Sequence, residues 1–180
     1  SVVTEYGLFE NSDWNVYIQN IGQYIVDSND FYDSQFRFYI INLDTPNAYA
    51  FPGGIVFISK GMLGVAENEA EIAAVIAHEI AHIIQKHGMI ETDKRKQQIK
   101  AGESFDELDR EIYKNYGESP DETEKELEEI SFEIFESIIQ GRLDEYEKEA
   151  DYLAMKYTYN SGYNPFALKN ILTRIKNQQS

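Results

Sequence analysis

Residues 68–87 read NEAEIAAVIAHEIAHIIQKH, and the rest of the chain is organised around this stretch. Isoleucine and valine recur every three or four residues between Ile72 and Ile84, with alanines between them, a pattern typical of a buried amphipathic helix. Asn68 is a suitable N-cap, and Glu71, three residues on, is a suitable capping-box partner. The stretch therefore predicts a long helix packed inside the protein.

Within this helix His78-Glu79-Ile80-Ala81-His82 spells His-Glu-x-x-His. Residues four apart lie on one helix face, so both imidazoles can bind a single cation, with Glu79 beside them. A hydrolytic Zn²⁺ site needs a third protein ligand and one open position for water, whose proton Glu79 would accept. The alternative is two histidines that fell four apart by accident on a core helix. With only three histidines in the chain, such a coincidence is improbable.

Composition restricts the class of protein. A chain of 180 residues with 42% hydrophobic content predicts one domain over 1–180, with a polar helical insertion at about 89–120. Cysteine is absent, which leaves His, Asp and Glu for metal binding. A net charge of −16 argues against nucleic acid and anionic membranes as partners, and no apolar run is long enough to span a bilayer.

The remaining elements predict an α+β fold, mostly helical, with a small sheet beside the His-Glu-x-x-His helix. Aromatic and β-branched residues predict strands over 36–43 and 55–58, joined by a bend and a short extended piece at 45–52. Helical periodicity predicts helices at 13–27, 61–66, 120–139, 142–159 and 165–176.

The third metal ligand is sought among the carboxylates of the helix at 142–159. Glu147 is preferred, because Asp151 lies one turn away on the same face and can accept the free N–H of a ligand histidine. Glu149 points away from both. The alternative is that this is one more solvated acidic face, and spacing alone does not decide between the two.

Three segments carry a family resemblance. Glu147-Lys148-Glu149-Ala150-Asp151 resembles the Glu-x-x-Ala-Asp element of the HtpX-like and CAAX prenyl endopeptidase metallopeptidases, peptidase family forty-eight. Residues 47–54, NAYAFPGG, resemble the hairpin of that family, and residues 162–165, GYNP, resemble a segment that follows its third ligand. The segments occur in family order and, with the zinc helix, cover most of the chain.

The resemblance implies a zincin-like gluzincin domain in which Glu147 completes the zinc site and Asp151 supports a histidine. It makes Asn47 a candidate site-lining residue. An arginine often lies three residues before the ligand glutamate in the family, but here that position is Asp144. The chain is most similar to the soluble bacterial members, so we expect the bacterial periplasm or cell envelope, with the cytoplasm as the alternative.

His87 is also weighed as a ligand. Metzincins place a glycine and a third histidine at the positions that correspond here to 85 and 88, but this chain has Gln85 and Gly88. His87 lies nine residues after His78, about half a turn round a continuous helix, so we expect it to face elsewhere and to be structural or to cap the helix end.

The expected function is zinc-dependent hydrolysis of peptide bonds in unfolded or misfolded proteins, as in protein quality control. Ile55, Val56, Phe57 and Ile58 are candidates for a sheet edge that pairs with an extended substrate. A tyrosine among 157, 159 and 163 is a candidate oxyanion donor, although such residues are more often core. The alternatives are a non-hydrolytic zinc-containing binding or chaperone module and a latent protease that requires activation. The sequence leaves the oligomeric state open.

Overall fold

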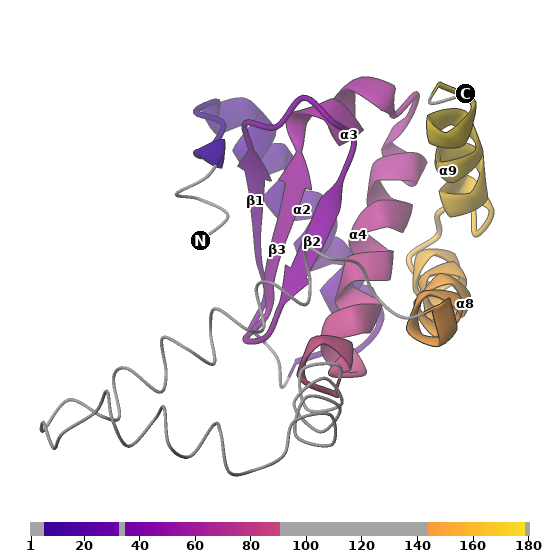
Figure 1. Ribbon diagram of the computed structural model, residues 1–180. Coiled ribbons are helices and arrows are strands. Elements are labelled where there is room, and N and C mark those ends of the chain that lie inside the picture. Colours follow the sequence, from indigo (N-terminus) through magenta and orange to yellow (C-terminus); the bar gives the residue numbers. More distant parts are fainter. Residues whose placement is uncertain (1–5, 33–34, 91–143, 179–180) are drawn as a thin grey trace, which may run out of the picture.

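The computed structural model describes residues 6–32, 35–90 and 144–178, which form an α+β fold as predicted (Figure 1). Residues 91–143, which include nearly all of the expected insertion and the helix expected at 120–139, lie outside the described part. The described elements are α2 (Ser12–Ser28), β1 (Arg37–Ile41), β2 (Ala48–Phe51), β3 (Ile55–Ser59), α3 (Lys60–Val65), α4 (Glu69–Ile84), α8 (Asp144–Asn160) and α9 (Ala167–Gln178).

The three strands form one sheet in the order β1-β3-β2. β3 pairs with β1 in parallel and with β2 in antiparallel orientation, so both sides of β3 are hydrogen bonded. The expectation that Ile55–Ile58 is a sheet edge is therefore wrong. The extended piece that follows Asn47 is itself strand β2, and with β1 it leaves neither side of β3 open for a substrate strand.

Helix α4 lies between the sheet and the pair α8 and α9, while α2 lies behind the sheet in the view of Figure 1. The core is aliphatic, and its side chains come from α2, the strands and α4. Its fully buried members include Ile18, Ile25, Ile40, Val56, Ile58, Ile76 and Ile80. The core holds α4 on several sides, which fixes the helix that carries the histidines.

A side-chain hydrogen bond caps the start of α4, and a left-handed backbone conformation follows its end. Asn68 is the N-cap, and its Oδ1 accepts from the Glu71 backbone N–H at 3.1 Å. The Glu71 carboxylate accepts from the backbone N–H of Glu67 rather than from that of Asn68. The helix ends at Ile84, and Lys86 has a φ of +57° in the left-handed region. The chain therefore turns sharply just before His87.

Candidate metal centre

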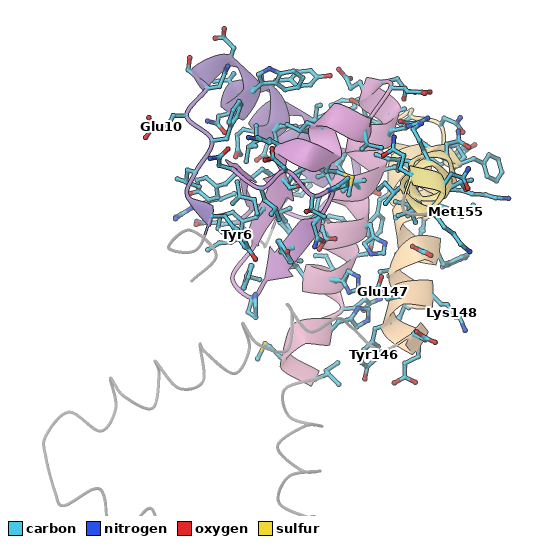
Figure 2. All side chains as sticks on the ribbon, turned by 45° about the horizontal axis from the view of Figure 1, so that its top comes forward. Tyr6, Glu10, Tyr146, Glu147, Lys148 and Met155 are labelled. Atoms are coloured by element: carbon cyan, nitrogen blue, oxygen red, sulfur yellow. The ribbon has the colours of Figure 1, made fainter. Side chains whose placement is uncertain are left out.

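His78 and His82 of α4 meet Glu147 of α8. The two Nε2 atoms lie 3.0 Å apart, and the Glu147 carboxylate lies 3.3 Å from His78 Nε2 and 3.4 Å from His82 Nε2. In Figure 2 Glu147 lies on the side of α8 toward α4, and its neighbour Lys148 points away. One imidazole edge from each histidine and one carboxylate therefore converge on a single point, as a metal site requires.

These distances suit a tetrahedral ion. Zinc ligands at 2.0–2.1 Å from the metal are separated from one another by about 3.3 Å, the edge of the tetrahedron. The three separations observed here, 3.0, 3.3 and 3.4 Å, are similar to that edge, and the last two are measured from different oxygens of Glu147, Oε2 to His78 and Oε1 to His82. Two imidazole nitrogens and a carboxylate are also a donor set that zinc commonly takes. The residues therefore supply the donor set and the spacing that a zinc site needs.

The far side of His78 contacts Asp151. His78 Nδ1 lies 3.0 Å from Asp151 Oδ1, a close ion-pair contact in which the N–H is not aligned as a hydrogen bond. Burial lowers the pKa of His78, but the contacts with Asp151 and Glu147 and the charge of Glu79 outweigh burial and raise it to about 9. This cluster of carboxylates stabilises positive charge at the position that a cation would occupy.

The far side of His82 contacts His87. His82 Nδ1 lies 2.9 Å from His87 Nδ1, and His87 Nε2 lies 3.4 Å from Glu149 Oε2. Tyr146 stacks on the His87 ring with a centroid separation of 4.6 Å, and only 1% of His87 is exposed. The expectation that His87 faces away from the other histidines is wrong, because α4 does not continue to residue 87.

The sequence held one signal for this contact. Gln85, Lys86 and Gly88 interrupt the apolar pattern, which indicates that the helix stops before His87. Once the helix stops, helical spacing no longer predicts the direction of the next side chain. Glu149, which spacing placed away from Glu147 and Asp151, reaches His87 instead.

The other candidate residues lie at different places. Glu79 follows His78 on α4 and is 4% exposed. Asn47 bonds within the hairpin, where its Nδ2 donates to the Tyr49 hydroxyl at 2.9 Å. Tyr157 packs in the core against Phe31, and the Tyr163 hydroxyl donates to Glu69 at the opposite end of α4 from His82. Tyr159 is 71% exposed on the last turn of α8. The structure thus brings none of these tyrosines to the histidines.

The chain has a buried helix that carries His-Glu-x-x-His beside a small sheet, and a glutamate from a second helix completes the cluster. This combination defines a zincin-like metallopeptidase domain. The model of Peptidase family M48 matches residues 13–178 of this chain. The chain therefore belongs to peptidase family M48.

Curated relatives agree with this assignment. The chain is 30% identical over 165 residues to the Beta-barrel assembly-enhancing protease of Yersinia pestis, an alignment that covers 90% of this chain and 32% of the relative. It is 38% identical over 71 residues to the protein of the same name from Escherichia coli K12, covering 39% of this chain and 15% of that protein. It is 34% identical over 89 residues to the Mitochondrial metalloendopeptidase OMA1 of Schizosaccharomyces pombe, covering 48% of this chain and 26% of that protein. The chain thus spans about a third or less of the length of these relatives.

Proposed function

We propose that this domain is a zinc-dependent endopeptidase in which His78, His82 and Glu147 hold the metal and Glu79 is the general base. The observation that carries the proposal is the convergence of the two imidazole nitrogens and the Glu147 carboxylate, which lie 3.0–3.4 Å from one another. When bound, zinc supplies Lewis acidity toward the scissile carbonyl and the attacking water. The rest of the chemistry is assigned to residues of α4 and α8.

Glu79 is assigned the proton transfers. It lies next to a metal-binding histidine on a buried helix, and its charge contributes to the raised pKa of His78, so its field acts within the site. As a carboxylate it accepts a proton from the attacking water, and it then gives that proton to the leaving amine. Asp151 holds the His78 ring from behind and keeps its Nε2 directed at the metal position.

The proposed substrates are unfolded or misfolded polypeptides, cleaved as part of protein quality control. A cavity of about 140 Å³ opens beside His82 and is bordered by the end of β2, including Ala50 and Phe51, and by Ile83 and Met89. Its apolar lining suits a hydrophobic side chain of the kind that folded proteins bury.

The proposed location is the bacterial periplasm or cell envelope. Bacterial relatives are named for the assembly of β-barrels, the architecture of the integral proteins of the bacterial outer membrane. Within the described residues, none of the helices has the length and apolarity to cross a membrane.

The test combines a casein cleavage assay with a zinc-binding measurement on the same preparation. We expect a chelator to abolish cleavage and added zinc to restore it. We also expect Glu79→Gln to lose cleavage while zinc stays bound. Tight zinc binding with no cleavage would instead support a non-hydrolytic module. Cleavage that appears only after limited trimming would support a latent protease.

A further inference from the structure

We propose that His87 is a positioning residue that holds His82 in the tautomer and orientation needed for metal binding, with Glu149 holding His87 in turn. This inference rests on the proposed metal site, and it adds two residues to that site. The observation that carries it is the chain of contacts from His82 Nδ1 to His87 Nδ1 at 2.9 Å and from His87 Nε2 to Glu149 Oε2 at 3.4 Å.

Valence fixes where the protons lie along this chain of contacts. If His82 binds metal through the lone pair of Nε2, its proton is on Nδ1 and must be donated to His87 Nδ1. His87 Nδ1 is then the acceptor, so His87 carries its own proton on Nε2. That nitrogen faces Glu149, and an ionised carboxylate can only accept. Each of the three groups therefore has one consistent role, and a doubly protonated His87 would set two N–H groups against each other.

The backbone brings His87 to this position. On a continuous helix His87 would lie about 140° around the axis from His82 and could not reach its ring. The left-handed φ of +57° at Lys86 ends the helix and turns the chain back, so that His87 lies against His82. Tyr146, one residue before Glu147 on α8, stacks on the outer face of the His87 ring with an interplanar angle of 20°. Both helices that supply metal ligands therefore also hold His87.

The two metal-binding histidines are supported differently as a result. His78 has a carboxylate directly behind it, whereas His82 has a neutral imidazole between itself and a carboxylate. A ligand histidine donates its second N–H to a partner that fixes the ring, and loss of that partner typically lowers metal affinity or activity by 10–100-fold. His87 is that partner for His82.

The experiment compares the 180-residue chain with His87→Leu, which removes the acceptor, and with His87→Gln, which keeps an acceptor oxygen. Glu149→Leu tests the next contact, and Lys148→Leu, on the same helix but pointing away, is the matched control. Zinc affinity is measured by competition with a chromophoric chelator, and ¹⁵N NMR of the histidine rings reports which nitrogen carries each proton. We expect His87→Leu to lose about 10–100-fold in zinc affinity and His87→Gln to lose clearly less. The zinc affinity of Glu149→Leu should lie between those of wild type and His87→Leu. Lys148→Leu should bind zinc as tightly as wild type.

The tautomer of His87 is the decisive readout, since a merely structural His87 need not carry its proton on Nε2. In the wild type we expect the proton of His82 on Nδ1 and that of His87 on Nε2. A proton of His87 on Nδ1 would overturn the inference, as would wild-type zinc affinity in His87→Leu. A proton of His82 on Nε2 would instead refute the proposed metal site. If His87→Leu does not fold, the tautomers of the wild type and the affinity of His87→Gln still decide. A wild-type chain that binds no zinc would refute the proposed metal site itself, which is a separate outcome.

Discussion

Replacing Arg174 with methionine should destabilise the fold strongly, because Arg174 is the partner of a buried carboxylate. Its guanidinium donates to both oxygens of Glu71, at 2.7 and 2.9 Å, and the Glu71 side chain is 2% exposed. The pair is only partly buried, because the Arg174 side chain is 23% exposed, and Glu71 keeps the Glu67 backbone N–H as a donor. Loss of a charged hydrogen-bond partner by the buried Glu71 carboxylate costs about 1.5–3 kcal/mol. The contact of Arg174 with Glu67 adds little, since the Glu67 side chain is 67% exposed.

At 2–4 °C per kcal/mol for a chain of this size, the expected fall in Tm is about 3–12 °C. The free energy of unfolding is measured by urea denaturation at neutral pH. Lys169→Met, at an exposed position on the same helix, is the matched control and should stay within about 0.5 kcal/mol of wild type. The double variant Glu71→Leu/Arg174→Met should recover much of the loss, because it leaves no buried charge.

The pH dependence provides a second check. In the wild type, hydrogen bonding to Arg174 lowers the pKa of Glu71 below 4.5, so its contribution to stability is present above that value and is lost only at lower pH. In Arg174→Met, burial without the guanidinium raises the pKa of Glu71, so the variant gains stability as Glu71 takes up a proton. The difference between the two proteins should therefore shrink as the pH falls from neutral. A difference that widens as the pH falls, or an Arg174→Met variant as stable as Lys169→Met, would refute the reasoning.

Three further predictions follow from other parts of the chain. Glu79→Gln should lower kcat/KM for peptide cleavage by about 10²–10⁴-fold while zinc affinity by chelator competition stays unchanged; near-normal turnover would remove Glu79 as the base. Lys86→Gly should raise the free energy of unfolding by about 1 kcal/mol in urea denaturation, because glycine adopts a φ of +57° without a Cβ clash; a loss of stability would contradict the strained turn. Gly54→Ala should lower the free energy of unfolding by more than about 2 kcal/mol in the same measurement. Gly54 has a φ of +87°, and its added Cβ would collide with the Gln35 carbonyl oxygen. A neutral result would mean that the turn before β3 is built differently.

The helix that carries the histidines could be predicted from sequence because its signals are local. The apolar periodicity and the Asn68 cap lie within one continuous segment, and the structure has α4 starting at Glu69 as the cap implies. Glu147 and Asp151 were harder, because they follow His82 by more than sixty residues and lie among many other carboxylates. Only the resemblance to a family separated them from a solvated acidic face.

The strand order and the position of His87 could not be predicted in the same way. The hairpin at residues 47–54 places β2 beside β3, but strands of four or five residues carry little information about more distant neighbours. Nothing local showed that β1 would pair with the other side of β3 and leave β3 in the middle. His87 depends on a single left-handed residue, Lys86, at a position without the glycine or asparagine that usually marks such a turn. One backbone angle therefore reversed the predicted direction of a buried side chain.

The geometry of the metal centre depends on how α8 docks against α4. Both helices carry alanines that are completely buried in the main core: Ala73, Ala74, Ala77 and Ala81 on α4, and Ala150 and Ala154 on α8. Small side chains allow a close approach of the helices, so that Glu147 reaches both histidines. The far end of α8 is tied to α2, where Asn29 Nδ2 donates to the Tyr157 carbonyl at 3.2 Å and Asn160 Nδ2 donates to Asn29 Oδ1 at 2.9 Å. Because Glu147, Glu149 and Asp151 all lie on α8, a shift of this helix would withdraw the third proposed ligand and the supports of both histidines together.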